Sequence, residues 1–190
     1  TDMQITLQFA TGPITENLDK VEVKGFDLAV DWAPADNFTI RASVAYNDSE
    51  ITEFTGTTVF DPTSFVSGPQ DIIGNSLPRA PEWSSNVSAN YAIPLSGGNS
   101  GSIVLGGSMS YTSDFNHTQF GNVLMTPGYT LWNANVSWYS PSGTFSINVF
   151  GRNLSNEEYV LTSFFTDAFG VLLFPGAPRT LGVQVRYNFE

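Results

Sequence analysis

The sequence predicts an all-β fold in which about eight antiparallel strands form a transmembrane β-barrel. Segments with a two-residue apolar period occur along the whole chain, and the connections between them alternate between short and long. Charged residues make up only 13% of the chain, about half of the ~25% that is typical of a soluble domain. A length of 190 residues suits one domain.

The predicted strands are segments in which apolar and polar side chains alternate, so that one face of each strand is apolar. The pattern is clearest near the C-terminus, where Val183 and Val185 lie on one face and Gln184 and Arg186 on the other. No stretch has a sustained helical period, and no apolar run approaches the ~20 residues of a membrane helix. The strands are expected at residues 3–9, 26–32, 38–47, 83–93, 102–111, 132–138, 145–152 and 180–189.

The connections between these strands differ systematically in length. Short turns are expected at residues 34–37, 94–101 and 140–143, and long loops at residues 55–81, 114–128 and 160–176. Outer-membrane barrels have short periplasmic turns and longer external loops. The alternation therefore favours such a barrel, with the C-terminus on the periplasmic side.

The cost of burying charge in lipid predicts which face of each strand meets lipid and which face lines the lumen. A charge on the lipid face at the bilayer midplane costs ~2–4 kcal/mol, so the charged strand residues should share the polar face that lines the lumen. Most of them do share the polar phase of their strands. The residues expected to face the lumen are Asp27, Asp31, Arg41, Asn133, Asn135, Asn148, Arg152, Gln184 and Arg186.

A soluble β-sandwich or β-barrel would show similar alternation, because one face of its sheet packs against a core. Its polar face would then meet water and should be rich in Lys and Glu. Here the polar face is built mainly from Ser, Thr, Asn and Gly, and the chain has only two lysines, Lys20 and Lys24. The composition of the polar face therefore favours the membrane barrel.

Charge and residue counts argue against several classes of function. Seven basic against eighteen acidic residues give a net charge of −11, which disfavours nucleic acid as a partner. The absence of cysteine excludes disulfides, iron–sulfur clusters and thiol catalysis. The single histidine, His117, leaves little for a zinc site, and no serine nucleophile is placed beside it. We expect no enzyme, no metal site and no cofactor.

The long loops contain aromatic side chains that are candidates for ligand contact, since exposed loops on a rigid scaffold commonly carry binding residues. Packing of one loop on another would explain the same residues equally well. The candidates are Phe60, Phe65, Phe164, Phe165 and Phe169.

Several motifs, in this order, resemble the C-terminal part of the β-barrel of TonB-dependent outer-membrane receptors. The most specific is Gly-Arg-Asn-Leu-Ser-Asn-Glu-Glu-Tyr at residues 151–159, which is similar to the Asn-Leu-Thr/Ser-Asp/Asn-x-x-Tyr pattern of the family. Each motif is weak alone, but the ordered set spans nearly the whole chain. The others lie at residues 21–28, 32–34, 74–83, 127–133 and 175–180.

The resemblance implies a receptor in the outer membrane of a Gram-negative bacterium. In that family about twenty-two strands enclose an N-terminal plug, and the plug receives energy through TonB for the uptake of scarce ligands, most often ferric siderophores. Residues 1–190 would be the last eight strands, and the plug and earlier strands have no counterpart here. The expected partners are outer-membrane lipid, the rest of the barrel with its plug, TonB through that plug, and a ferric siderophore. Phe189 would be the aromatic signal read by the barrel-assembly machinery.

Two alternatives remain at this stage. The chain could be a self-contained outer-membrane protein of about eight strands with a structural or adhesive role, since eight strands can close into a barrel filled by side chains. The segments around residues 3–9 and 183–189 would then have to pair, because each otherwise exposes an unpaired strand edge. A soluble ligand-binding β-barrel is the second alternative.

Overall fold

The fold is built around one antiparallel sheet of seven strands. The computed structural model describes residues 3–9, 12–55, 59–61, 66–68, 71–97, 100–118, 124–166 and 170–189. Within these ranges, no helix is long and apolar enough to cross a membrane. The sheet has the order β15-β12-β11-β8-β7-β4-β3. Its strands are β3 (Lys20–Ala35), β4 (Phe38–Glu53), β7 (Trp83–Pro94), β8 (Ser102–Thr112), β11 (Tyr129–Tyr139), β12 (Phe145–Arg152) and β15 (Thr180–Tyr187).

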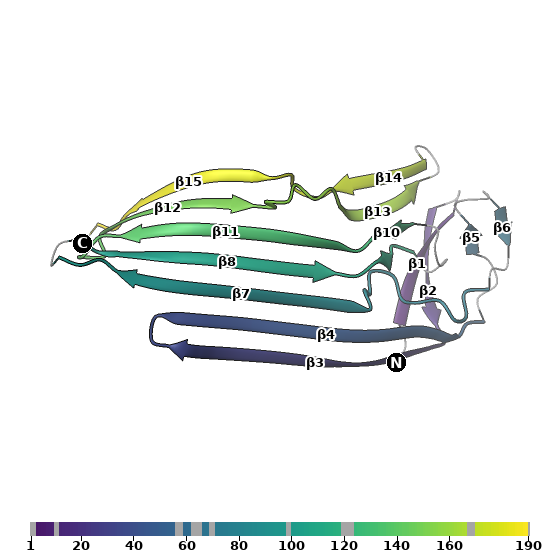
Figure 1. The fold of residues 1–190 in the computed structure, drawn as a ribbon. Coiled ribbons are helices and arrows are strands. Elements are labelled where there is room, and N and C mark those ends of the chain that lie inside the picture. Colours follow the sequence, from purple (N-terminus) through teal and green to yellow (C-terminus); the bar gives the residue numbers. More distant parts are fainter. Residues whose placement is uncertain are drawn as a thin grey trace.

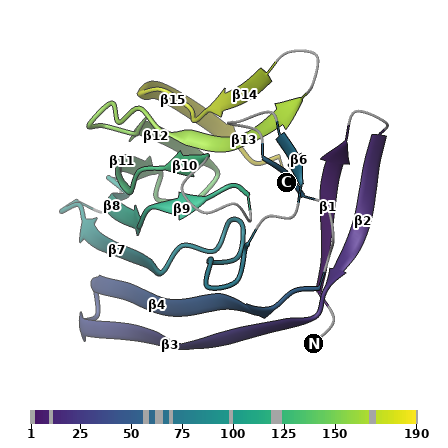
Figure 2. The ribbon, with the colours of Figure 1, turned by 90° about the vertical axis from the view of Figure 1, so that its right-hand side faces the viewer.

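The strands of this sheet lie side by side along the length of the molecule (Figure 1). Viewed along the strands, the sheet curves into an arc with β15 at one end and β3 at the other (Figure 2). The sheet does not close, because β3 pairs only with β4 and β15 only with β12 among the residues that the structure describes. The closed eight-stranded barrel of the first alternative is therefore not formed.

The segment at residues 3–9 is a strand, but its predicted place in the main sheet is wrong. It forms β1 (Met3–Phe9), which pairs with β2 (Gly12–Leu18) as a separate hairpin. The hairpin satisfies the backbone hydrogen bonds of β1 locally, and only Asp19 separates β2 from β3. The sequence pattern does not predict β2, because Glu16 interrupts the apolar phase between Ile14 and Leu18 and Pro13 disfavours a strand.

The two ends of the sheet differ as expected. The turns after β3, β7 and β11 lie at one end, here called the turn end, together with the C-terminus (Figure 1). The opposite end, the loop end, carries the long connections and the β1–β2 hairpin. The long connections also contain short hairpins, which the sequence did not predict: β5 (Val59–Asp61) with β6 (Val66–Gly68), β9 (Phe115–Asn116) with β10 (Met125–Thr126), and β13 (Val160–Thr166) with β14 (Gly170–Pro175).

The strand register keeps the two kinds of side chain on opposite faces of the whole sheet, which confirms the predicted phases. Directly paired residues share a face, so a row across the sheet shows what each face contains. One row on the apolar face, here the outer face, contains Val30, Ala42, Val87, Met109 and Trp132. The neighbouring row on the polar face, here the inner face, contains Asp31, Arg41, Ser88, Ser108 and Asn133.

The outer face is left uncovered along its length. Val30 is 50% exposed, Val136 47% and Val183 66%. The buried apolar cluster of the described residues is small, and it joins Leu18 and Ile51 to two residues of the segment before β7. A soluble β-sandwich would bury these outer stripes against one another, and the structure does not do so.

Aromatic side chains form two groups on the outer face, one nearer the loop end and one nearer the turn end. Toward the loop end, the rings of Phe26, Tyr46 and Trp83 contact one another, with centroid distances of 4.7–6.0 Å. Toward the turn end, Phe38 contacts Tyr91 at 6.1 Å. Phe38 and Tyr46 both lie in β4, and the eight residue steps from one to the other span about 26 Å at ~3.3 Å per residue.

Two glycines at the turn end provide a matched test of the strand connections. Gly101 and Gly143 both have a left-handed φ, of +77° and +71°, which costs an L-residue about 1–2 kcal/mol. A Cβ at Gly101 would also collide with the backbone carbonyl of Tyr139, whereas a Cβ at Gly143 would meet nothing within 4 Å. We expect Gly101→Ala to lower the free energy of unfolding, measured by urea denaturation, by clearly more than Gly143→Ala. An equal loss of unfolding free energy in both variants would contradict the close approach of the β7–β8 turn to Tyr139.

Candidate functional site

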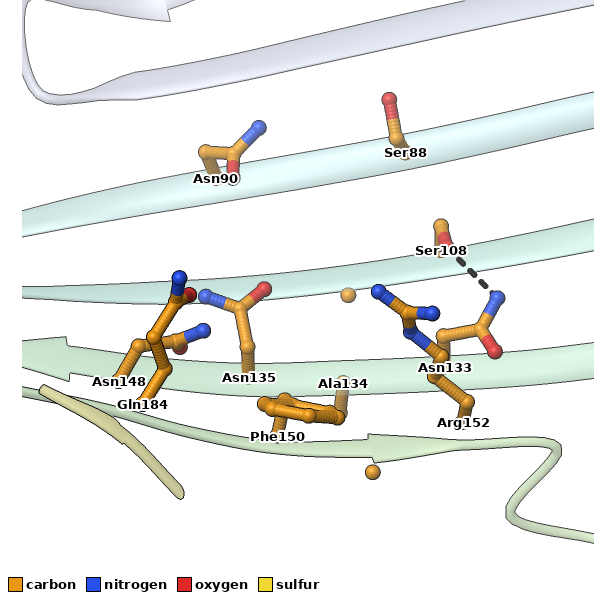
Figure 3. Close-up of a pocket in the computed structure, with 12 residues that line it drawn as sticks. Ser88, Asn90, Ser108, Asn133, Ala134, Asn135, Asn148, Phe150, Arg152 and Gln184 are labelled. Carbon is orange, nitrogen blue, oxygen red and sulfur yellow. Dashed lines mark hydrogen bonds between the residues drawn. The ribbon is translucent and has the colours of Figure 1, made fainter. Parts of the chain in front are cut away.

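A polar hollow on the inner face brings together much of the predicted lumen lining (Figure 3). It has a volume of about 400 Å³ and is formed by strands β7, β8, β11, β12 and β15. Side chains from five strands can line one hollow only where the sheet is concave, so the inner face is the concave face. The predicted residues that line the hollow are Asn133, Asn135, Asn148, Arg152 and Gln184.

Two glycines make room for the side chains of this hollow. Gly106 of β8 is paired with Asn90 on one side and Asn135 on the other. A Cβ at Gly106 would collide with Oδ1 of Asn135 and come within 3.1 Å of Oδ1 of Asn90. Gly182 of β15 is paired with Phe150, whose ring atom Cζ would lie 2.5 Å from a Cβ at Gly182. The missing side chains therefore let the neighbouring amides and the ring lie over the sheet.

Hydrogen bonds between side chains fix several of the amides. Nδ2 of Asn135 donates to Oγ of Ser137 at 3.3 Å, and Oγ of Ser137 donates to Oδ1 of Asn148 at 3.0 Å. Nδ2 of Asn133 donates to Oγ of Ser108 at 3.2 Å (Figure 3). Oδ1 of Asn133 accepts the backbone N–H of Asn153 at 3.0 Å. The hollow thus presents oriented amide and hydroxyl groups, which can donate to and accept from a polar surface or ligand.

Phe150 lines the hollow, although the sequence pattern did not predict it as a lumen residue. It lies on the polar phase of β12, between Asn148 and Arg152. The guanidinium carbon of Arg152 lies 5.3 Å from the centroid of its ring, within the range of a cation–π contact. The ring therefore orients the arginine in the hollow. One signal in the sequence could have revealed this position. Phe150 is an aromatic residue on the polar face of its strand, and the neighbouring strand carries Gly182, which leaves room for its ring.

The other predicted lumen residues lie on the inner face but outside this hollow. Asp27 lines a second hollow of about 280 Å³ between β3, β4 and β7. Arg41 donates from Nε to Oδ1 of Asp31 at 2.9 Å, and both side chains are largely exposed. Arg186 is paired with Ser146, in phase with the pair Asn148 and Gln184.

Three of the sequence motifs meet at the loop end of β11 and β12. The ring of Tyr129, from the motif at residues 127–133, stacks on the ring of Tyr159 with centroids 4.6 Å apart. Gly176, from the motif at residues 175–180, lies against the ring of Tyr159, where a Cβ would collide with it. The N–H of Gly176 donates to the carbonyl of Tyr159 at 2.7 Å. These motif residues pack on one another, which indicates a structural role.

Asn153 organises the turn that follows β12. It is 4% exposed and has a φ of +48°. Its Oδ1 accepts the N–H of Glu157 at 2.8 Å, and its Nδ2 donates to the carbonyls of Glu157 and Ala177 at 2.9 and 3.0 Å. Asparagine tolerates a left-handed φ better than most residues, so the motif places at this position a residue that fits both the backbone and the hydrogen bonds.

A second polar cluster, here called the loop junction, joins three long loops at the loop end: the one before β7, the one between β8 and β11, and the one between β12 and β15. It consists of Arg79, Asn116, His117, Thr126, Val160, Thr162 and Ser163. The N–H of Arg79 donates to the carbonyl of Asn116 at 2.7 Å, and its Nη2 donates to Oγ1 of Thr162 at 2.9 Å. His117 lies 2.6 Å through Nε2 from Oγ1 of Thr126. No pattern in the sequence predicts that these residues lie together.

The environment of His117 disfavours its protonated form. The side chain is 7% exposed, and its ring contacts Phe115 with centroids 4.9 Å apart. Burial, followed by the positive charge of Arg79, holds the pKa of His117 below its ordinary value. The imidazole is therefore neutral at neutral pH.

The predicted aromatic contacts lie outside what the structure describes. Phe65 and Phe169 are outside the described residues, and for Phe60, Phe164 and Phe165 only the backbone of β5 and β13 is described. Their role in ligand contact stays a prediction. Phe189, the expected assembly signal, is 88% exposed just beyond β15, and its ring contacts that of Tyr187 with centroids 4.8 Å apart.

Substitution of Asn153 tests the structural role of the turn. Asn153→Ala removes three side-chain hydrogen bonds, worth about 0.5–1.5 kcal/mol each, so we expect a loss of about 2–4 kcal/mol in the free energy of unfolding. Asn156 also has a left-handed φ, of +55°, but its Oδ1 accepts one hydrogen bond, from the N–H of Arg179. Asn156→Ala should therefore cost about 1–3 kcal/mol less under the same urea denaturation. The same loss in both variants would assign the effect to φ alone.

Comparison with known proteins agrees with this geometry. Residues 1–154 match the family model for the TonB dependent receptor-like β-barrel. No curated protein shows significant sequence similarity to the chain. Among solved structures, it is similar to FyuA, the ferric yersiniabactin uptake receptor from Yersinia pestis, with a TM-score of 0.73 and 17% identity over 90% of this chain and 24% of that one.

Two further structures show the same fold. BauA, the ferric preacinetobactin receptor from Acinetobacter baumannii, has a TM-score of 0.67 and 17% identity over 100% of this chain and 26% of its own. The copper transporter OprC has a TM-score of 0.63 and 15% identity over 99% of this chain and 27% of its own. The chain thus spans about a quarter of each of these proteins. It belongs to the β-barrel family of TonB-dependent receptors, which are transport receptors of the Gram-negative outer membrane.

Proposed function

We propose that this chain is the C-terminal part of a receptor barrel that imports a ferric siderophore or a similar iron complex across the outer membrane. The observation that carries the proposal is the two-faced sheet: an uncovered apolar outer face opposite a concave inner face of amides, hydroxyls and arginines. A wall between lipid and an aqueous or protein-filled lumen needs this division of side chains. Two proteins with the same fold support an iron complex as the ligand: FyuA is a ferric yersiniabactin uptake receptor, and BauA is a ferric preacinetobactin receptor.

The outer face would lie against the hydrocarbon of the membrane. Its two aromatic groups, around Tyr46 and Phe38, are about 26 Å apart along β4, close to the ~25 Å height of the apolar band in outer-membrane barrels. Tyrosine and tryptophan favour the two membrane interfaces because their rings are apolar at one end and polar at the other. The turn end is then periplasmic and the loop end external.

The inner face would face a plug domain and the water beside it, and TonB would act through that plug. The exposed edges of β3 and β15 would pair with the remaining strands of the barrel, since an unpaired edge in lipid leaves backbone groups without hydrogen bonds. The hollow beside Arg152 supports contact with a polar, oxygen-rich surface. Its amides and its guanidinium can bond to the carbonyl or carboxylate oxygens of a plug or of a metal chelate.

Uptake assays with the full-length receptor test the proposed ligand class. Deletion of its gene should abolish the uptake of radioactive iron supplied as a catecholate, hydroxamate or mixed-ligand siderophore, and a plasmid copy should restore it. A strain without TonB is the control, because energised import should be lost there too. Copper is the second candidate, since OprC transports copper. Loss of copper uptake with iron uptake intact would favour that candidate, and loss of neither would contradict metal import.

Arginine substitutions on neighbouring positions of β15 test the assignment of the faces. Val183 is on the outer face and Gln184 lines the hollow on the inner face. Val183→Arg should impair folding of the full-length receptor into lipid vesicles, because a charge at the lipid face costs ~2–4 kcal/mol near the midplane. Gln184→Arg should fold nearly as well as the wild type. Folding is measured by the heat-dependent shift in gel mobility, and equal yields for both variants would contradict the assignment.

A further inference from the structure

We propose that His117 is an acid-sensitive latch that holds the external hairpin β13–β14 to the hairpin β9–β10. The latch would hold at neutral pH and release when the imidazole is protonated. The inference depends on the geometry of the loop junction and on the position of the loop end outside the cell. It does not depend on which ligand the receptor imports.

The hydrogen bonds around the ring define one protonation state. The backbone N–H of Ser163 in β13 points to Nδ1 of His117 at 3.4 Å, so Nδ1 must be the acceptor. In a neutral ring the proton is then on Nε2, which donates to Oγ1 of Thr126 at 2.6 Å. Oγ1 of Thr126 is in turn 3.5 Å from the carbonyl of Val160 and can donate to it. A neutral imidazole thus completes a continuous chain of donors and acceptors between β10 and β13.

Protonation would break this chain at Nδ1. The new N–H at Nδ1 would face the N–H of Ser163, and two donors cannot bond to each other. The resulting charge would also lie in a site where the ring is 7% exposed and Thr126 is 2% exposed. A buried charge whose N–H at Nδ1 has no acceptor is costly, so the protonated ring would favour opening of the contact with β13.

The positive charge of Arg79 favours the same direction. Arg79, from the segment before β7, is the cation that acts on the ring, and it binds β13 through Thr162. Three acids, Asp48 of β4, Glu82 just before β7 and Asp114 just before β9, line a hollow next to Asn116. Burial and Arg79 nevertheless lower the pKa of His117 overall. Strands β9, β10, β13 and β14 themselves contain no titratable side chain. Protonation of His117 would therefore place a second positive charge near Arg79.

The sign of the pH effect follows from the depressed pKa. The open state has a histidine of ordinary pKa, about 6.5, and binds a proton more readily than the latched state. The latch is therefore fully stable above about pH 6.5 and loses stability as the pH falls below that value. At about pH 5.5, one unit below the ordinary pKa, the opening equilibrium can increase by up to about tenfold.

Hydrogen exchange of the full-length receptor in lipid nanodiscs tests the latch. The peptide that covers residues 160–166 reports on the N–H of Ser163 and on its neighbours. Between about pH 7.5 and about pH 5.5, after correction for the intrinsic exchange rate, we expect its protection to fall several-fold, by at most about tenfold. A peptide from β12 should keep its protection over the same range. A change below about twofold in residues 160–166 would overturn the proposal.

Two variants identify the titrating group. His117→Gln cannot be protonated, so its exchange at residues 160–166 should not respond to pH, even if its protection is lower throughout. Arg79→Gln removes the nearby cation and brings the pKa of the latched His117 closer to its ordinary value, so the fall in protection between about pH 7.5 and about pH 5.5 should be smaller than in the wild type. A pH response that persists in His117→Gln, or a fall in protection that is as large in Arg79→Gln as in the wild type, would overturn the role of His117. If a variant folds poorly, the pH response of the wild-type receptor still tests the proposal.

Discussion

The structure depends above all on the strand register of one antiparallel sheet. Each direct pair places two side chains on the same face, and a slip of one residue would move every side chain of that strand to the other face. Across the sheet, this register keeps Val30 in phase with Trp132, and Asp31 in phase with Asn133. A membrane wall requires this separation, because a misplaced charge on its outer face would have to be buried in lipid.

The inner face adds a second constraint, which is space. Several long polar side chains can gather on a concave sheet only if some positions carry no side chain. Gly106 and Gly182 meet this requirement under Asn135 and Phe150, and Phe150 in turn orients Arg152. The hollow is therefore a product of residues on adjacent strands, and its shape and polarity follow from pairs that are far apart in the chain.

The loop end is held together by different interactions from those that hold the sheet. Its order comes from a few buried polar groups, such as Asn153 and His117, that satisfy the backbone of the connections. Such contacts are local, and each can open without loss of the barrel wall. This separation would allow the external loops to respond to pH or to a ligand while the sheet stays intact.

The sequence alone determined the fold class, the positions of the sheet strands, the alternation of turns and loops, and the face of each strand residue, because a two-residue period is a local property. It also placed Asn133 and Gln184 correctly on the polar face that carries the hollow. Only the tertiary structure decided that β1 pairs with β2, that Phe150 belongs to the hollow, and that His117 contacts β13. These features depend on which segments meet in space, and sequence periodicity does not encode that information.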